Sequence, residues 1–208
     1  ILSRVDAEAI RRRAFTVAAD PGNGAGCVTT PYLLRALGCR VVSLNAQPDG
    51  AFPGRLPEPT QEHLGDLMLL VVQARADLGV AHDGDADRAI FVDEKGAFLH
   101  GDKSLALLAR AELRHRGGLV VTPVSTSSMI DDVVKEAGGT VRRTKVGSPI
   151  VAHVMFENGA AFGGEENGGV IFPAHQFCRD GGMSLAKMLD FVAYEEKPLS
   201  TLVAALPQ

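Results

Sequence analysis

The run from His82 to Arg88, HDGDADR, holds the most concentrated set of chemically useful side chains in the sequence. Three carboxylates alternate with small residues, and apolar, strand-like segments flank the run on both sides. In extended backbone every second side chain projects to the same side, so Asp83, Asp85 and Asp87 are expected to surround one point. Magnesium (Mg²⁺) favours carboxylate oxygens and commonly meets phosphate in the same site. Arg88 adds a cation suited to a phosphate or sugar-phosphate oxygen. The run therefore predicts a magnesium site.

Two other interpretations of this run need a test. A solvated acidic turn stays open on spacing alone. A calcium-binding EF-hand loop also carries acidic residues at its first, third, fifth and twelfth positions, which Asp83, Asp85, Asp87 and Glu94 match. Its sixth position must be glycine, whereas Arg88 stands there, and no amphipathic helix precedes the run. We exclude the calcium loop.

A second polar group lies in the glycine-flanked segment from Gly164 to Gly169, GEENGG. Glycines let the backbone turn sharply and let a ligand approach closely. Glu165 and Asn167 would point the same way in an extended segment, where a carboxylate and an amide suit neighbouring hydroxyl groups. Lys145 adds a positive charge just before Gly147, near an expected helix start. The alternative is an ordinary hairpin with a polar tip.

Three further motifs have structural explanations beside the chemical ones. Gly22, Gly24 and Gly26 precede a helix and could hold an anion, but their spacing matches no phosphate-binding fingerprint, so a structural turn is favoured. The hydroxyl run 125–128 has no histidine partner motif and is expected to cap a helix. The turn 179–182 could carry function or only cap the last helix through Asp180.

Composition narrows the class of protein. The chain has 208 residues, 46% of them hydrophobic, with a net charge of −4, which argues against generic nucleic-acid binding. The longest apolar run, 67–72, is too short to cross a membrane, and no signal peptide is visible. Three cysteines without ligand-like spacing fit a reducing cytoplasm. The chain begins at Ile1, not Met, and we expect it to be a piece of something longer.

The elements that must position these residues alternate between strand and helix, which favours an α/β layered fold. The two halves show similar alternation and could be one duplicated fold, with the boundary near Leu99 to Gly101. Thr60, Asp102 and the hydroxyl run 125–128 are expected to cap helices. Predicted strands cover 16–19, 40–44, 78–81, 89–92, 119–122, 140–144, 160–163 and 170–172, and predicted helices cover 28–37, 60–75, 102–114, 125–137, 150–157 and 183–194.

Taken together, the motifs resemble those of the α-D-phosphohexomutases, in the right order and over essentially the whole chain. The family's D-G-D-G/A-D-R metal loop is seen as 83–88, and its G-E-x-S/N-G sugar loop as 164–168. The segments DPGNGAG at 20–26, PDGAFP at 48–53, PEP at 57–59 and TKVG at 144–147 also look like family signatures. The Glu-Glu-Asn-Gly-Gly form looks most like the archaeal-type phosphomannomutase/phosphoglucomutase branch.

The resemblance implies four domains around a cleft. This chain would supply the second domain, residues 1–99 with the metal loop, and the third, residues 100–208 with the sugar loop, as two consecutive α/β/α layered domains with mixed sheets. The first domain's T-A-S-H-N-P phosphoserine loop and the fourth domain's R-x-S-G-T-E-P phosphate loop have no counterpart in the sequence. These two missing domains of the same polypeptide are expected partners, together with a hexose phosphate substrate and no nucleic acid or membrane.

The resemblance also implies roles for individual residues. Asp83, Asp85 and Asp87 would bind Mg²⁺, and Arg88 would contact the phosphoserine or the transferring group. Glu165 and Asn167 would bind the sugar hydroxyls. Lys145 would act in the cleft as an acid/base or a phosphate contact, in a substrate-binding loop with Gly147. Ser148 takes a position where some relatives carry His, which puts an acid/base role there in doubt.

The expected function is the central part of a phosphohexomutase. It would interconvert hexose 1-phosphate and hexose 6-phosphate of glucose or mannose through a phosphoserine and a 1,6-bisphosphate, and the isolated chain is expected to be inactive. Phosphoglucosamine mutase is an alternative within the family. Two rivals lie outside it: a magnesium-dependent phosphohydrolase with Asp83 as nucleophile, and a non-catalytic sugar-phosphate-binding module.

Overall fold

The first of two mixed β-sheets is built from the N-terminal half of the chain. The computed structural model describes residues 1–207. Strands β1 (Thr16–Asp20), β2 (Arg40–Ser43), β3 (Leu78–His82) and β4 (Ala89–Asp93) form the order β2-β1-β3-β4. β1 pairs in parallel with β2 and β3, and β4 runs antiparallel to β3. The connection between β3 and β4 is the acidic loop, so the central strand β3 and the edge strand β4 hold it at one end of the sheet.

The second sheet repeats this topology. Strands β5 (Leu119–Pro123), β6 (Thr140–Thr144), β7 (Phe162–Gly164) and β8 (Val170–Ile171) form the order β6-β5-β7-β8, again with only the last pair antiparallel. The two halves thus share strand order and strand direction, as a duplicated unit would. The β7–β8 connection holds the GEENGG segment, which therefore occupies the same place in its sheet as the acidic loop does in the first.

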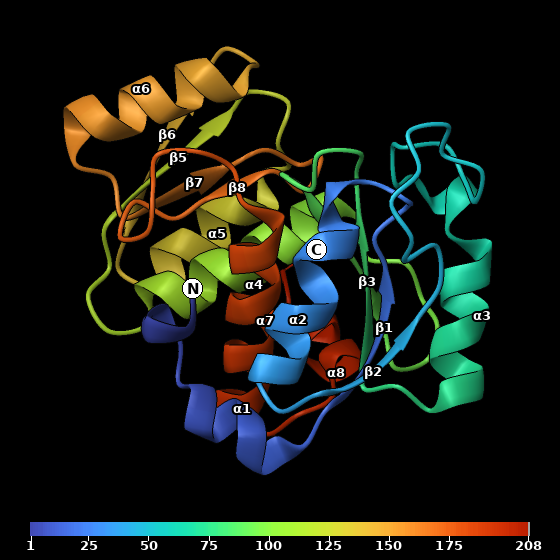
Figure 1. Cartoon of the computed structure of the whole chain (residues 1–208). Coiled ribbons are helices and arrows are strands. Elements are labelled where there is room, and N and C mark those ends of the chain that lie inside the picture. Colours follow the sequence, from blue (N-terminus) through green and yellow to red (C-terminus); the bar gives the residue numbers. More distant parts are fainter. Residues whose placement is uncertain (208) are drawn as a thin grey trace.

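Helices cover both faces of each sheet (Figure 1). α3 lies on the outer face of the first sheet and α6 on the outer face of the second, whereas α4 and α7 lie between the sheets and contact β4. The helical elements are η1 (Leu2–Arg4), α1 (Ala7–Arg13), η2 (Ala25–Val28), α2 (Thr30–Ala36), η3 (Gln61–His63), α3 (Gly65–Ala74), α4 (Gly101–Leu113), α5 (Met129–Glu136), α6 (Ser148–Asn158), α7 (Gly181–Glu195) and α8 (Leu199–Ala204). The expected α/β/α fold with mixed sheets is confirmed.

The alternation of side chains along the strands explains this layering. In β1, Val17 and Ala19 face the core between the two sheets, whereas Ala18 packs under α3. The central cluster continues from the first half into the second, through α4 and α7, without a break at residue 99. A separate cluster beneath α6 includes Val151 and Met155. This shared core fixes the ends of the two sheets relative to each other.

Several predicted helix starts differ from the structure. Thr60 caps no helix, because a 3-10 turn follows it and its hydroxyl lies 3.2 Å from His63 Nδ1. Asp102 lies inside α4, which His100 caps, and its carboxylate accepts the N–H of Ser127 instead. In the hydroxyl run only Ser127 accepts a helix N–H, from Met129. Asp180 caps α7 as predicted, by accepting the N–H of Met183.

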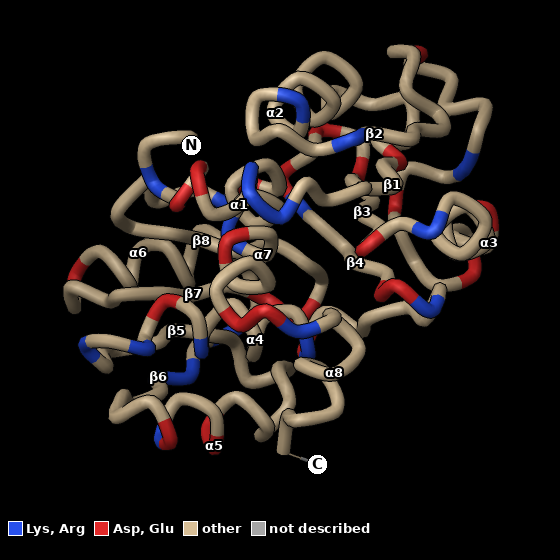
Figure 2. Tube along the Cα trace, turned by 90° about the horizontal axis from the view of Figure 1, so that it is seen from below, with Lys and Arg blue, Asp and Glu red and all other residues tan. Residues whose placement is uncertain are grey.

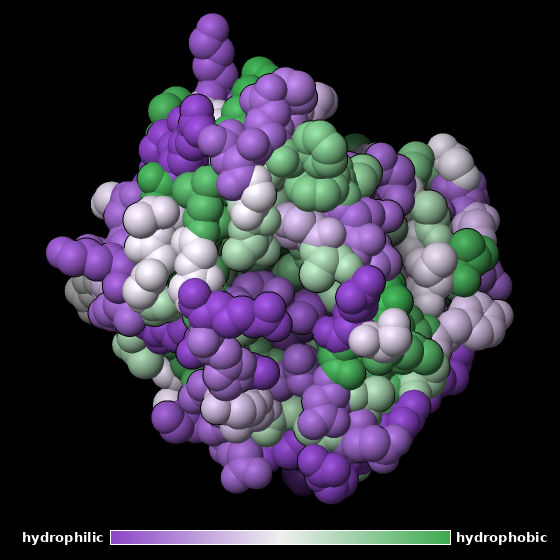
Figure 3. Space-filling view, turned by 90° about the vertical axis from the view of Figure 1, so that its left-hand side faces the viewer, coloured by the Kyte–Doolittle hydropathy of each residue, from purple (hydrophilic) through white to green (hydrophobic). Residues whose placement is uncertain are grey.

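Surface charge and hydropathy are mixed. Basic and acidic residues are interspersed along the trace in Figure 2. On the face shown in Figure 3, hydrophilic residues separate several smaller hydrophobic patches. Among residues 1–207, no helix combines the length and apolarity that crossing a membrane requires. Cys27, Cys39 and Cys178 are all free thiols.

Candidate functional site

The acidic loop gathers its three carboxylates as the alternation predicted. One oxygen each of Asp83, Asp85 and Asp87 lies within 4.8 Å of the other two. Ala86, between the second and third carboxylates, has a left-handed φ of 63°, which turns the loop back toward β4. This backbone costs a residue with a Cβ roughly 1–2 kcal/mol, because the Cβ approaches the following carbonyl oxygen. The loop therefore turns back on itself with its three carboxylates close together, rather than extending into solvent.

Burial makes this concentration of charge costly in the absence of a cation. Asp83 is 7% exposed, and burial together with the charges of Asp87 and Asp85 raises its pKa to about 6, against a hydrogen bond from the Arg88 N–H. Oδ1 of Asp87 is buried and has no hydrogen-bond donor among residues 1–207. A buried carboxylate oxygen without a donor is the kind of atom that a divalent cation satisfies. The donor set, three carboxylates and no sulfur or nitrogen, fits magnesium.

Arg88 lies between two sets of carboxylates. Its Nη1 lies 2.5 and 2.6 Å from the two carboxylate oxygens of Glu58. Its Nε lies 3.3 Å from Asp83 Oδ2 and 3.8 Å from Asp87 Oδ1, close enough for ionic attraction but without a hydrogen bond. Glu58, the middle residue of the PEP motif, had no role predicted from the sequence.

A buried arginine fixes the segment that carries Glu58. The Arg55 side chain is 4% exposed, and its Nε donates to Asp20 Oδ2 at 2.7 Å. Nη2 donates to the carbonyls of Asp20 and His82, and Nη1 donates to those of Leu56 and Pro57. One guanidinium therefore joins the ends of β1 and β3 to the PEP segment.

The glycine loop after β1 packs against this same region. A Cβ added to Gly22 would lie 2.7 Å from Arg55 Nη2, and one added to Gly24 would collide with the carbonyl of Gly84 in the acidic loop. Ala25 donates its N–H to that carbonyl at 2.9 Å. These contacts support the structural interpretation of the glycines, because they let two loops pack closely.

The two predicted side chains of the GEENGG segment, Glu165 and Asn167, lie in different surroundings. Glu165 is 4% exposed, its Oε1 accepts the N–H of Gly147 at 3.0 Å, and its Oε2 lies 3.4 Å from Arg179 Nη1. Asn167 is partly exposed, and its Oδ1 accepts the N–H of Gly169. Lys145 is exposed and forms no ion pair within residues 1–207. Gly147 thus ties the TKVG segment to the GEENGG segment, while the Lys145 side chain stays in solvent.

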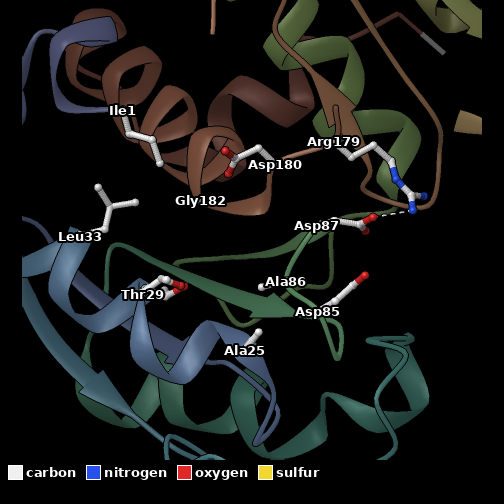
Figure 4. A pocket seen from close by; sticks show the side chains of 11 residues that line it. Ile1, Ala25, Thr29, Leu33, Asp85, Ala86, Asp87, Arg179, Asp180 and Gly182 are labelled. Carbon is white, nitrogen blue, oxygen red and sulfur yellow. Dashed lines mark hydrogen bonds and ion pairs between the residues drawn. The ribbon is translucent and has the colours of Figure 1, made fainter. Parts of the chain in front are cut away.

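The acidic loop and the GEENGG segment lie directly against each other. Ala89 donates its N–H to the Gly168 carbonyl at 3.1 Å, and Arg88 and Gly169 form an antiparallel bridge. Arg179 spans the junction, with Nη2 2.5 Å from Asp87 Oδ2. Figure 4 shows this ion pair at one end of a cavity of about 350 Å³, which also touches α2 and the start of α7.

A second cavity, of about 370 Å³, also borders this junction, at Asn167 of the GEENGG segment. Its walls include Glu58, His100, Glu166 and Asn167. Arg55, Glu58 and Arg179 are the residues at this junction to which the sequence analysis gave no assigned role. The only sequence signals were the PEP motif for Glu58 and the turn before α7 for Arg179.

Comparisons with known proteins agree on one family. The family model for phosphoglucomutase/phosphomannomutase α/β/α domain II matches residues 1–96, and that for domain III matches residues 100–208. A phosphoglucomutase/phosphomannomutase of Thermococcus kodakarensis is 54% identical over the whole chain, which covers 46% of that protein. A phosphoglucosamine/phosphogalactosamine mutase of Sulfurisphaera tokodaii is 42% identical, again over the whole chain and 46% of the relative. The chain thus spans about half the length of these relatives.

Solved structures give the same result. A phosphoglucomutase/phosphomannomutase family protein from Burkholderia thailandensis superimposes with a TM-score of 0.86 at 31% identity, over 97% of this chain and 46% of that one. The open form of pp63/parafusin, a phosphoglucomutase from Paramecium, superimposes with a TM-score of 0.81 over 96% of this chain and 38% of that one. Its 23% identity supports the fold alone.

Proposed function

Because the chain belongs to the phosphoglucomutase/phosphomannomutase family, we propose that it is the central part of a phosphohexomutase. The whole protein would interconvert hexose 1-phosphate and hexose 6-phosphate through a phosphoserine and a 1,6-bisphosphate intermediate. The observation that carries this proposal is the direct junction of the acidic loop with the GEENGG segment. A phosphoryl-transfer metal and a sugar must meet in one place for this reaction, and the junction supplies both sets of side chains.

The acidic loop supplies the electrostatic part of the proposed chemistry. Asp83, Asp85 and Asp87 would hold Mg²⁺, which, when bound, neutralises negative charge that develops during phosphoryl transfer. Arg88 is proposed to contact the phosphoserine or the transferring phosphoryl group. Its partly buried guanidinium, already oriented by carboxylates on two sides, supports that role, because a fixed donor need not reorganise during the reaction.

The second loop supplies the proposed sugar contacts. Asn167 is partly exposed and can accept and donate hydrogen bonds to hydroxyl groups. Glu165 is proposed to accept sugar hydroxyls with the lone pairs that Gly147 and Arg179 leave free. Lys145, exposed beside Gly147, is proposed to contact a phosphate or to transfer a proton. The remaining domains, with the phosphoserine and a further phosphate loop, are proposed to come from the rest of the same polypeptide.

The sugar itself has two candidates. The name of the Thermococcus relative supports glucose and mannose phosphates, and that of the Sulfurisphaera relative supports an amino-sugar phosphate. The carboxylate of Glu166 in the wall of the second cavity supports the amino sugar, since it would favour an ammonium group. We further propose a cytoplasmic location, supported by the three free thiols.

Two measurements test the proposal. Calorimetry of this chain with MgCl₂ should give a binding isotherm that disappears when Asp83, Asp85 and Asp87 are all changed to Asn. The matched control changes three exposed acidic residues elsewhere, Asp66→Asn, Asp132→Asn and Glu157→Gln, and should leave binding intact. Equal heat from both triple variants would contradict the metal assignment.

Turnover tests the reaction. The full-length protein should convert glucose 1-phosphate, mannose 1-phosphate or glucosamine 1-phosphate to the 6-phosphate, and the three rates would rank the sugars. These 208 residues alone should not. Robust conversion by the isolated chain, or release of inorganic phosphate from a generic phosphomonoester, would contradict the proposal and favour the phosphohydrolase.

A further inference from the structure

Arg88 lies near three carboxylates, which is more negative charge than its single guanidinium can neutralise. Its Nη1 binds both oxygens of Glu58, while its Nε faces Asp83 and Asp87 at 3.3 and 3.8 Å. Asp83 and Asp87 are the same carboxylates proposed to hold a metal. A guanidinium that paired fully with them would compete with a divalent cation for the same oxygens. The position of Arg88 between the two sets therefore bears on metal binding.

Glu58 is placed to decide this competition. Its backbone follows directly on the carbonyls of Leu56 and Pro57, both held by Arg55 Nη1. The Arg55 side chain is 4% exposed and is fixed in turn by Asp20 and by the His82 carbonyl at the end of β3. Glu58 therefore approaches the acidic loop from a segment anchored to the same strand that delivers the loop.

We propose that Glu58 is a positioning residue that holds Arg88 away from the metal-binding carboxylates. With Glu58 in place, the shortest ion pair of Arg88 is with Glu58 at 2.5 Å, whereas Asp83 and Asp87 lie 3.3 and 3.8 Å from its Nε and accept no hydrogen bond from it. Asp83 and Asp87 then keep more of their negative charge for a divalent cation, although Arg179 still pairs with Asp87 Oδ2, and Arg88 stays directed for an anionic ligand. The inference rests on the proposed metal site.

Metal affinity gives the first test. Glu58→Gln should let Arg88 turn toward Asp83 and Asp87 and weaken Mg²⁺ binding about tenfold, equivalent to ~1.4 kcal/mol. Glu62→Gln removes an equal charge from an exposed residue that pairs with no cation in residues 1–207, and it should change affinity less than about twofold. The double variant Glu58→Gln/Arg88→Gln removes the competitor as well and should restore affinity to within about threefold of the unmodified chain. Equal affinities of the Glu58→Gln and Glu62→Gln variants would overturn the inference.

A metal-free measurement separates this inference from the proposed function. Phenylglyoxal modifies accessible arginines, and the modified residues can be counted by mass spectrometry of peptides. In metal-free buffer, Glu58→Gln should change the modification rate of Arg88 at least about threefold, while exposed Arg12 reacts at an unchanged rate as the internal reference. An unchanged Arg88 rate would overturn the positioning role even if Mg²⁺ binds. If Mg²⁺ does not bind but the modification rate of Arg88 changes, the metal site is wrong and the positioning of Arg88 by Glu58 is supported.

Discussion

Replacing Arg55 by Met should destabilise the chain more than any exposed arginine substitution. The change keeps much of the side chain's apolar volume but removes five hydrogen bonds, to the carboxylate and carbonyl of Asp20 and to the carbonyls of Leu56, Pro57 and His82. Asp20 is 1% exposed, so its charge would remain buried with no ionic partner. Its other oxygen already accepts the N–H of Gly22 and the amide of Asn45, which do not neutralise it.

The size of the loss follows from this burial. Removing one member of a buried ion pair costs roughly 3–5 kcal/mol, because the other charge is left uncompensated in a poorly polarisable site. For a chain of this length, each kcal/mol shifts the melting temperature by about 2–4 °C, so a fall of roughly 6–20 °C is expected. Urea unfolding followed by far-UV circular dichroism measures the loss of stability directly.

Two control variants sharpen the interpretation of that result. Arg12→Met, at an exposed helix position, should change stability by no more than about 0.5 kcal/mol. Adding Asp20→Asn to Arg55→Met removes the unpaired buried charge of Asp20 and should recover at least about 1 kcal/mol of the lost stability. A loss below about 1 kcal/mol for Arg55→Met, or no recovery in the double variant, would refute the buried-pair reasoning.

Three further predictions concern the glycine loop, a helix end and the thiols. Gly24→Ala should push the acidic loop from its position and weaken Mg²⁺ binding roughly tenfold in calorimetry, whereas Gly50→Ala, with no atom within 4 Å of the new Cβ, should not change it. Arg75→Gly should stabilise the chain by about 1 kcal/mol in urea unfolding, because Arg75 ends α3 with a left-handed φ of 50° that glycine adopts more easily. A destabilised variant would contradict this explanation. Exposed Cys178 should react with a disulfide reagent at pH 8 before Cys39 does. Burial raises the pKa of Cys39 to about 11, so its reactive thiolate is scarce at that pH. Equally fast reaction of both thiols, measured by peptide mass spectrometry, would show that Cys39 is not protected.

Local patterns in the sequence were enough to find the parts that depend on near neighbours. The alternation of Asp83, Asp85 and Asp87 predicted that the carboxylates converge, because in extended backbone the side-chain direction repeats every second residue. They do converge, although the loop turns at Ala86 and is not extended throughout. The apolar runs predicted every strand of both sheets to within a few residues. Asp180 was predicted as a cap because capping joins residues only three apart in the chain.

Elements held by distant contacts were not predictable in this way. α8 is six residues long and was not predicted; it packs Leu199 and Leu202 into the central core, and Ser200 bonds to Glu94. Short helices of this kind are stabilised by packing and not by local propensity. The predicted caps at Thr60 and Asp102 were wrong for a similar reason, since a contact elsewhere in the fold, or a 3-10 turn, took the place of the local bond.

The sequence by itself indicated which loops are candidates for chemistry and, through its motifs, which family they resemble. Only the tertiary structure decided how those loops are joined. The Arg88–Glu58, Arg55–Asp20 and Arg179–Asp87 pairs connect residues 30, 35 and 92 positions apart. The Arg179–Asp87 pair forms because two sheets of the same topology share one core, which brings their equivalent loops together. The other two pairs form within the first half, where the segment after β2 packs against the ends of β1 and β3. No local pattern encodes that separation, because an ion pair between distant residues depends on the packing of every element between them.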